Sequence, residues 1–319
     1  MLGTTTNSYD SAMAFDTVIT TDGDTITGPT RQPRQMLADQ AYDGHASVHD
    51  GDVAQDLGLP GAPIEGPTHF SQFDPLAFSL WGQRWFEGGC ISAHFQTMVV
   101  EGESVTASLT RSAEPDIARI DAVKPDGTPV LTGTVSVDPS ATTELAERLA
   151  KMQARDPGDL FIIDRLAVGQ RSRVETPVSI DMNTDNGMLY PFSLRRKLDG
   201  ITEPSPWYDT VDNPWGRPIV PFEMFSVLAN KVGSALAVRG PAVGLFIDLE
   251  VRVLDGPLFV DEEYVLDRQV LAVGQSRRVE SHWVETRISS VATGAHVATV
   301  LLHSGSFKAS YAAYPADRL

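Results

Sequence analysis

The feature that most constrains this 319-residue chain is an internal repeat with an offset of 154 to 155 residues. A turn of the type glycine-x-proline-isoleucine occurs at residues 61–64 and again at 216–219. An acidic residue followed by glycine occurs at 101–102 and again at 255–256. Because two landmarks repeat at nearly one spacing, the chain is expected to contain two copies of one structural unit.

Both copies show the same order of expected elements. An apolar segment follows each turn, at residues 67–80 and 222–237, with apolar positions at helical spacing and few charges, which predicts a buried helix. Strands with alternating apolar residues follow each helix, and they are expected at 90–100, 104–110, 118–123, 129–137, 245–253, 263–272, 279–290 and 295–307. One helix followed by a meander of strands is an α+β pattern.

The boundaries of the two copies follow from the segments between them. Residues 140–160 contain an amphipathic pattern that predicts a connecting helix. The expected organisation is therefore an N-terminal arm at 1–28 with a hairpin around Asp22-Gly23-Asp24, a first unit at 29–139, the linker at 140–160, a second unit at 161–312 and a tail at 313–319. A short helix at 52–57 is also expected, ended by Gly58 and Pro60.

Composition narrows the class of partner. A net charge of -17 argues against nucleic acid or an anionic membrane, since both require a basic face. No run of apolar residues reaches the length of a membrane helix, and the first residues lack the features of a secretory signal. A single cysteine, Cys90, fits a reducing compartment. We therefore expect a cytoplasmic protein.

Histidines gather close to the first apolar segment. His45, His49 and His69 are three of the seven in the chain. Imidazole titrates near neutral pH, so it suits proton transfer. We expect His49 to move the proton, with help from His45 or Asp50. The structural alternative is that His45 and His49 are loop residues that cap the next helix or contact solvent.

The same histidines allow two further interpretations. His69 faces either the pocket or the core. His45 and His49 have the spacing of a zinc pair on a helix, with His69 as a third ligand. Gly44 and the residues between the two histidines favour a loop over a helix, so no metal and no cofactor are expected.

The start of the first apolar helix could bind the carbonyl oxygen of a ligand. The first amides of a helix have no partner inside the helix, so they can stabilise charge on a carbonyl oxygen. Gly66 would allow an acyl group to approach this backbone closely. Glu65 lies at the same point, where it contributes to substrate binding or catalysis, or simply caps the helix.

The second unit offers Glu223, a carboxylate in an apolar segment. A buried carboxylate needs a partner or a raised pKa, so Glu223 is either functional or paired with a residue such as Arg217. Trp81 belongs to an aromatic set that either lines an acyl pocket or packs in the core, the other members being Trp85, Phe86, Trp207, Tyr208 and Trp215.

Several of these residues also carry a family resemblance. They are Tyr42-Asp43-Gly44, His49, Ala54, Gly58, Pro60-Gly61, Ile64, Gly66, Ser92 to Phe95, Val99 and Glu101-Gly102-Glu103. In this pattern the first half resembles the MaoC-like, (R)-specific enoyl-CoA hydratases, and the two halves together look like a double hotdog. The resemblance implies two long helices, each wrapped by an antiparallel sheet, and a homodimer. It also implies a hydratase or dehydratase that acts on an acyl thioester such as acyl-CoA.

Other functions fit the same residues. A hotdog thioesterase would use Glu223 or Glu65 to activate water. A lyase or cyclase on a substrate without CoA, and a binding protein that retains an acyl ligand unchanged, are further alternatives. Release of free thiol would distinguish hydrolysis from hydration, and recovery of an unchanged ligand would indicate a binding protein.

Overall fold

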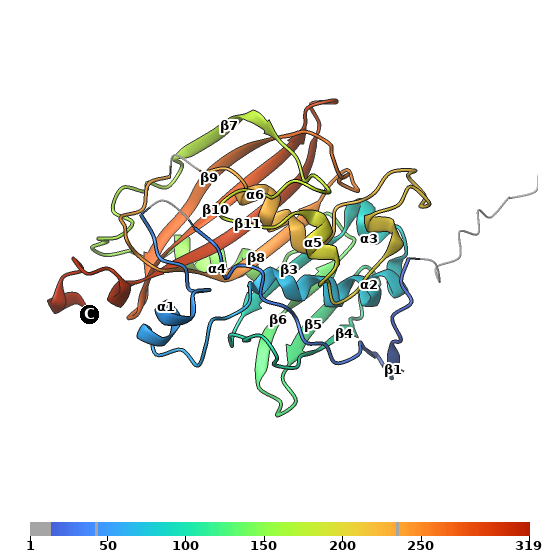
Figure 1. Cartoon of the computed structure of the whole chain (residues 1–319), viewed down its shortest axis with the longest axis horizontal. Helices are drawn as coiled ribbons and strands as arrows, with labels where there is room; N and C mark the ends of the chain where they lie inside the picture. The colour runs from blue at the N-terminus through green and yellow to red at the C-terminus, as the bar shows by residue number, and fades with distance from the viewer. Residues whose placement is uncertain (1–13, 42–43, 234–235) are drawn as a thin grey trace, which may run out of the picture.

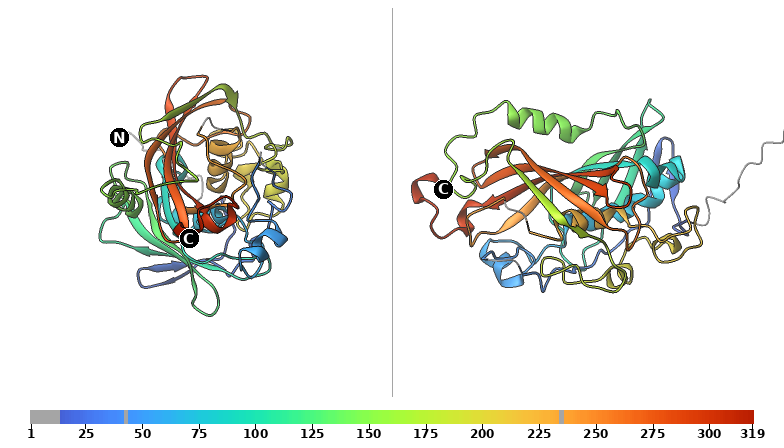
Figure 2. Two further views of the ribbon diagram at one scale, coloured as in Figure 1. Left: turned by 90° about the vertical axis from the view of Figure 1, so that its left-hand side faces the viewer. Right: turned by 90° about the horizontal axis from the view of Figure 1, so that it is seen from above.

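The computed structural model describes residues 14–41, 44–233 and 236–319 (Figure 1). Tyr42 and Asp43, which belong to the family pattern, therefore lie outside the described residues. The described part of the chain forms an eleven-stranded antiparallel sheet in the order β1-β2-β4-β5-β6-β3-β8-β11-β10-β9-β7. The sheet curves around short helices that lie on its inner face (Figures 1 and 2).

Seven of the eight expected strands are present within three residues of their expected bounds, but β3 ends at Phe95, five residues before the expected end at residue 100. The strands are β1 (Thr20–Asp22), β2 (Thr25–Thr27), β3 (Cys90–Phe95), β4 (Thr106–Arg111), β5 (Ile117–Val123), β6 (Pro129–Ser136), β7 (Arg171–Val178), β8 (Gly244–Val253), β9 (Tyr264–Gln275), β10 (Val279–Ser290) and β11 (His296–Phe307). The α-helices are α1 (Gly51–Asp56), α2 (Asp74–Trp81), α3 (Arg84–Gly88), α4 (Glu144–Gln153), α5 (Leu194–Leu198) and α6 (Phe225–Asn230). The 3₁₀ helices are η2 (Gly66–Phe73), η3 (Pro206–Tyr208), η4 (Phe222–Met224), η5 (Lys308–Ser310) and η6 (Ala316–Arg318).

The register of the central strands reflects the repeat. β3 pairs with β8, and His94 lies opposite Asp248. These two positions are 154 residues apart, the offset found in the sequence. Outward from this pair, the order β3-β6-β5-β4 in the first half mirrors the order β8-β11-β10-β9 in the second. The two copies are therefore related by an approximate two-fold axis that passes between β3 and β8.

The first apolar segment is helical and buried, as predicted, but it consists of two pieces. The 3₁₀ helix η2 is followed directly by α2. Pro75 lies in the first turn of α2 and has no N–H to donate to the carbonyl of Ser71, so a continuous α-helical ladder is interrupted there. Instead, the amide of Asp74 donates to that carbonyl.

The second apolar segment ends earlier than expected. α6 ends at Asn230, whereas the sequence predicted a helix to residue 237. The buried guanidinium of Arg268 on β9 donates to the carbonyls of Ala229 and Val232, at 2.7 and 2.9 Å. A cation that satisfies the last carbonyls of a helix stabilises its C-terminus, and this contact comes from a residue distant in sequence.

Of two other elements, one was missed in the sequence and one was predicted from it. β7 was missed because its sequence, RSRVETPV, lacks apolar alternation, and it pairs only with β9 at the edge of the sheet, where Pro177 is tolerated. The predicted connecting helix is present as α4. It packs on the outer face of the sheet, opposite η2 and α6, and its Leu145 contacts a cluster that includes Trp283 and Leu301 (Figure 2).

Candidate functional site

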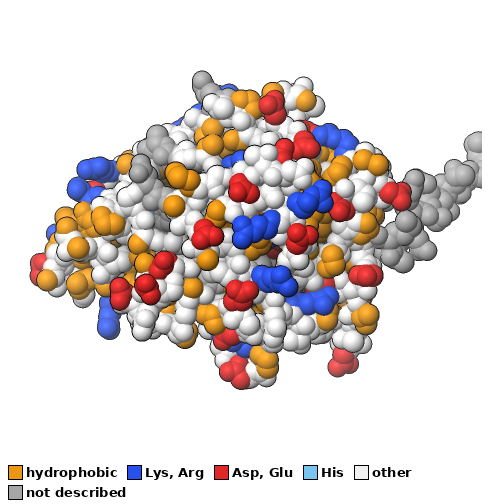
Figure 3. Space-filling model, in the orientation of Figure 1, with side chains coloured by type: hydrophobic (Ala, Val, Ile, Leu, Met, Phe, Trp, Pro, Cys, Tyr) orange, Lys and Arg blue, Asp and Glu red, His pale blue; other side chains and the backbone are white. Residues whose placement is uncertain are grey.

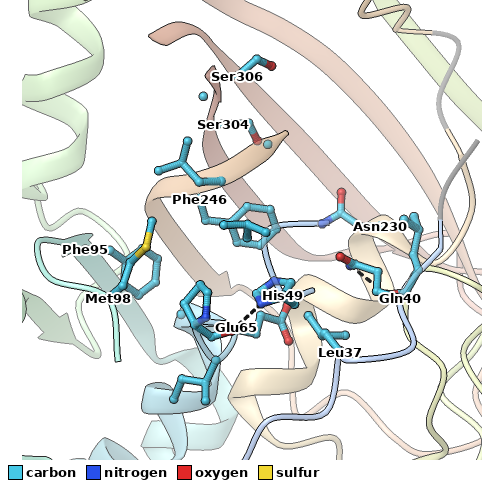
Figure 4. A pocket seen from close by; sticks show the side chains of 18 of the residues that line it. Leu37, Gln40, His49, Glu65, Phe95, Met98, Asn230, Phe246, Ser304 and Ser306 are labelled. Carbon is cyan, nitrogen blue, oxygen red and sulfur yellow. Dashed lines mark hydrogen bonds between the residues drawn. The ribbon is translucent and has the colours of Figure 1, made fainter. Parts of the chain in front are cut away.

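A cavity of about 530 Å³ lies between the inner face of the sheet and the start of η2. Both halves of the chain contribute to it (Figure 4). The first half supplies His45, His49, Glu65, Gly66, His69, Phe95 and Met98, and the second supplies Tyr190, Asn230, Leu245, Phe246, His282, Ser304 and Ser306. The predicted histidines and the predicted helix start are thus brought together in one cavity.

His49 is held in one orientation by the backbone. Its Nδ1 lies 2.6 Å from the carbonyl oxygen of Pro63. A carbonyl only accepts, so Nδ1 carries the hydrogen and Nε2 carries the lone pair. Burial lowers the pKa of His49 and outweighs the opposing effect of the hydrogen bond to Pro63. The imidazole is therefore a neutral base at pH 7.

Glu65 lies two residues after Pro63 and is 7% exposed. Its Oε1 has no hydrogen-bond partner among the described residues. Burial raises the pKa of Glu65 to about 7, with the nearby charge of Lys197 lowering it and that of Glu223 raising it. A carboxyl group with this pKa exchanges a proton readily at neutral pH, which is the property required of a general acid or base.

His69 is a buried, neutral histidine on η2. The side-chain amide of Gln72 donates to the carbonyl of Val105, so its oxygen accepts from Nδ1 of His69 at 3.1 Å. Burial lowers the pKa of His69 to about 4. The side chain lines the cavity, so it faces the pocket rather than the core alone.

His45 also lines the cavity, but it does not form a helical pair with His49. Its Nδ1 lies 3.2 Å from the carbonyl oxygen of Ala242 in the second half. Within residues 14–41, 44–233 and 236–319, no group of three or more His, Cys, Asp or Glu side chains is placed to hold a metal ion.

The space above Gly66 is filled by protein. A Cβ atom at this position would lie 2.9 Å from the ring of Phe95. The missing side chain of Gly66 therefore allows β3 and η2 to pack closely. We expected an acyl group to approach Gly66 on this side, and that expectation is wrong, because the ring of Phe95 fills the space. The ring of Phe95 forms part of the cavity wall instead.

Two expected site residues have structural roles. Asp50 is exposed and caps α1, since its Oδ1 accepts from the amides of Asp52 and Val53 at 2.9 and 3.0 Å. His49 is oriented by Pro63 instead. Trp81 packs in the core and donates from Nε1 to the carbonyl of Pro115 at 2.9 Å.

The other aromatic residues also pack in the core rather than around the cavity. Trp85, Phe86, Trp207, Tyr208, Trp215 and Phe222 contact one another there. Asp74 lies among them and accepts hydrogen bonds from Trp85 and Tyr208 at 2.9 and 2.8 Å.

Glu223 connects the two halves and does not line the cavity. Its Oε2 accepts from the hydroxyl of Ser71 at 3.1 Å, and its Oε1 lies 3.6 Å from Nζ of Lys197. Lys197 also donates to the hydroxyl of Thr68 at 3.1 Å. The partner expected from the sequence was Arg217, which instead pairs with Glu262 at 2.8 Å. Glu223 of η4 is thus a buried residue that forms an ion pair with Lys197 of α5 and a hydrogen bond with η2.

Three polar residues of the cavity were not anticipated from the sequence. His282 on β10 and Ser304 and Ser306 on β11 point to the inner face of the sheet. Their positions in the strands followed from the apolar alternation, but the sequence does not show which strand face borders an empty volume.

The sequence matches no protein-family model and no curated protein. Solved structures are similar in fold. A protein from Chloroflexus aurantiacus named as a MaoC domain protein dehydratase has a TM-score of 0.54 and 13% identity, and the match covers 92% of this chain and 95% of that one. Rv0216 from Mycobacterium tuberculosis, described as a double hotdog protein, has a TM-score of 0.47 and 12% identity over 81% and 86% of the two chains.

The dehydratase domain of PpsC from Mycobacterium tuberculosis, solved with C12:1-CoA, has a TM-score of 0.47 and 13% identity over 91% and 97% of the two chains. At 12% to 13% sequence identity, these similarities show a shared fold and not a shared function. The chain has the double hotdog fold, which confirms the architecture expected from the sequence.

No helix in the described part of the chain is long and apolar enough to span a membrane. Acidic and basic side chains are interspersed on the face seen in Figure 3.

Proposed function

We propose that the chain is a hydratase or dehydratase that interconverts a 3-hydroxyacyl thioester and the corresponding 2-enoyl thioester. The observation that carries this proposal is the meeting of His49 and Glu65 in one cavity (Figure 4). One is a neutral imidazole with a free Nε2 lone pair, and the other is a carboxyl group with a pKa of about 7. The similarity in fold to a protein named as a dehydratase supports the same reaction class.

In the direction of dehydration, Nε2 of His49 takes a proton from the carbon next to the thioester carbonyl. The electron pair of that C–H bond forms the C=C bond as the C–O bond to the 3-hydroxyl breaks. Protonated Glu65 gives its proton to the departing hydroxyl, which leaves as water. Transfer of a proton from His49 to Glu65 restores the starting state, and hydration follows the same steps in reverse.

The start of η2 provides the electrostatic support that this reaction needs. The amide of Gly66 precedes the first hydrogen bond of η2, which runs from Thr68 to the carbonyl of Glu65 at 3.1 Å. We assign this amide to the thioester carbonyl, where a backbone donor is worth about 100-fold to 1,000-fold in rate. His45 and His69 line the same cavity, and we assign them to substrate positioning.

The identity of the thiol group belongs to the proposal as well. We propose CoA or another pantetheine thioester, because the mostly apolar wall of Phe95, Met98, Leu245 and Phe246 suits an acyl chain. The homodimer, the cytoplasmic location and the absence of a nucleic-acid partner remain predictions.

The test is to measure the rate of hydration of 2-enoyl thioesters of several chain lengths. The loss of the enoyl absorbance reports the reaction. His49→Gln should lower the rate by about 100-fold to 10,000-fold, the range of a lost general base. Asp50→Asn is a matched control, since it alters the neighbouring residue and asparagine also caps helices well. An unchanged rate for His49→Gln would remove His49 from the mechanism.

A second candidate is hydrolysis of the thioester. The observation that favours it is the unpartnered Oε1 of Glu65, since a carboxylate with a pKa of about 7 can also activate water. Glu223, the other carboxylate considered for this role, does not line the cavity. A colorimetric assay for free thiol separates the two reactions, because hydration leaves the thioester intact.

A further inference from the structure

The cavity has a second polar region, formed by His282, Ser304 and Ser306, which we call the serine end. His282 and Ser304 lie directly opposite one another in the β10–β11 ladder, and Ser306 lies two residues further along the same face. Figure 4 draws Ser304 and Ser306 in a different part of the cavity from His49 and Glu65. Apolar side chains, including Phe95, Met98 and Phe246, complete the lining.

The serine end is polar but carries no charge. Nδ1 of His282 is buried and has no hydrogen-bond partner among the described residues. Burial, reinforced by the nearby His303, lowers the pKa of His282 to about 4, so the imidazole is neutral at pH 7. Among the described residues that line the cavity there is no lysine or arginine. A carboxylate or phosphate would therefore find no counter-charge here.

We propose that the serine end binds an uncharged hydrogen-bonding group of the ligand, such as a hydroxyl, a ketone or an amide. Hydroxyl and neutral imidazole groups both donate and accept, so they match such a group from either side. A bare alkyl tail pushed into the same region would leave these polar groups without partners, which costs affinity. The serine end thus selects against plain acyl chains that are long enough to reach it.

This inference rests on the proposed function for the identity of the ligand as an acyl thioester. Two parts of such a ligand have the required chemistry. One is a polar group near the far end of the acyl chain, and the other is the pair of amides in the pantetheine arm. In the first case the serine end determines the acyl group accepted, and in the second it holds the carrier.

Binding of non-reactive probes tests the proposal without turnover. The probes are S-alkyl thioethers of pantetheine in a series of chain lengths, each with and without a terminal hydroxyl, and pantetheine itself. Calorimetry gives Kd for the wild type and for Ser304→Ala/Ser306→Ala. Ser281→Ala is the matched control, because this buried serine precedes His282 on the opposite face of β10.

If the acyl chain supplies the group, the wild type should bind hydroxyl-tipped probes about 3-fold to 10-fold more tightly at one chain length, the effect of one hydrogen bond. The double variant should lose this preference. If pantetheine supplies the group, the double variant should weaken binding of pantetheine and every thioether by a common factor. His282→Phe should reproduce either pattern and serves if the double variant does not fold.

Equal Kd values for the wild type and the double variant across all probes would overturn the proposal. The outcome is separable from that of the proposed function. A protein that shows the binding preference but no enoyl turnover would contradict only the hydratase mechanism. An active enzyme whose ligand Kd values do not change when the residues of the serine end are replaced would contradict only this inference.

Discussion

Replacement of Asp248 by asparagine should weaken the junction between the two halves. Asp248 is fully buried on the outer face of β8, between β3 and β11. Its carboxylate accepts from Nδ1 of His94 at 2.7 Å and from Nδ1 of His303 at 2.6 Å, and Nε of Arg148 on α4 lies 2.9 Å away. One carboxylate thus joins three strands and the connecting helix.

The expected magnitude follows from the pKa of this carboxylate. Burial raises the pKa, but the hydrogen bonds from His303 and His94 and the charge of Arg148 outweigh it and bring the pKa to about 2. A depression from the ordinary value of 3.8 corresponds to roughly 2 kcal/mol of folding stability. Removing one partner of a buried ion pair leaves the others uncompensated, so the total loss at pH 7 should be about 2 to 5 kcal/mol.

Urea unfolding of the wild type and of Asp248→Asn measures this loss. Because the folded pKa is depressed, the contribution is fully present above about pH 4 and is lost as the pH falls toward 2. The difference between the two proteins should therefore be constant from pH 7 to about pH 5 and shrink below pH 4.

Asp74→Asn is a matched control with the opposite expected sign. Asp74 is equally buried, but burial raises its pKa to about 8 despite hydrogen bonds from Trp85 and Tyr208. Keeping this carboxylate ionised is unfavourable, so a neutral amide should leave the free energy of unfolding unchanged or raise it at pH 8. Equal losses in the two variants, or a loss in Asp248→Asn that persists undiminished at pH 3, would refute the reasoning.

Three other predictions concern the cavity and the sheet. Glu65→Gln should lower the dehydration rate by about 100-fold or more. It should also abolish the fall in rate that is expected for the wild type above about pH 7, where Glu65 loses its proton. A fall in rate at high pH that persists in the variant would assign this step to another group. Gly66→Ala should displace the ring of Phe95, which would lie 2.9 Å from the new Cβ. This should raise KM and lower the stability of the fold by about 1 to 3 kcal/mol. Unchanged kinetics would show that the Phe95 ring can move without affecting the cavity. Gly133→Ala should lower the free energy of unfolding in urea by at least that amount, because its Cβ would overlap the carbonyl oxygen of Ser92 in β3; wild-type stability would contradict the close pairing of β3 and β6.

Much of the architecture was predictable because its signals are local. The alternation of apolar residues in β10 predicted its bounds, Val279–Ser290, and the repeat predicted the equivalence of β3 and β8. Where the determining contact is distant, prediction was wrong. α6 ends at Asn230 because Arg268 of β9 binds its last carbonyls.

The candidate site likewise has features that the sequence indicated and features that depend on distant contacts. The sequence by itself indicated a histidine of suitable chemistry before a helix start, and the structure places His49 and Glu65 in one cavity at that point. Only the tertiary structure decided that Asp50 caps a helix, that Glu223 pairs with Lys197, and that the serine end borders the same volume. The physical reason is that periodicity shows which face of an element a residue occupies. Its protonation and its partners depend on burial by segments far away in the chain.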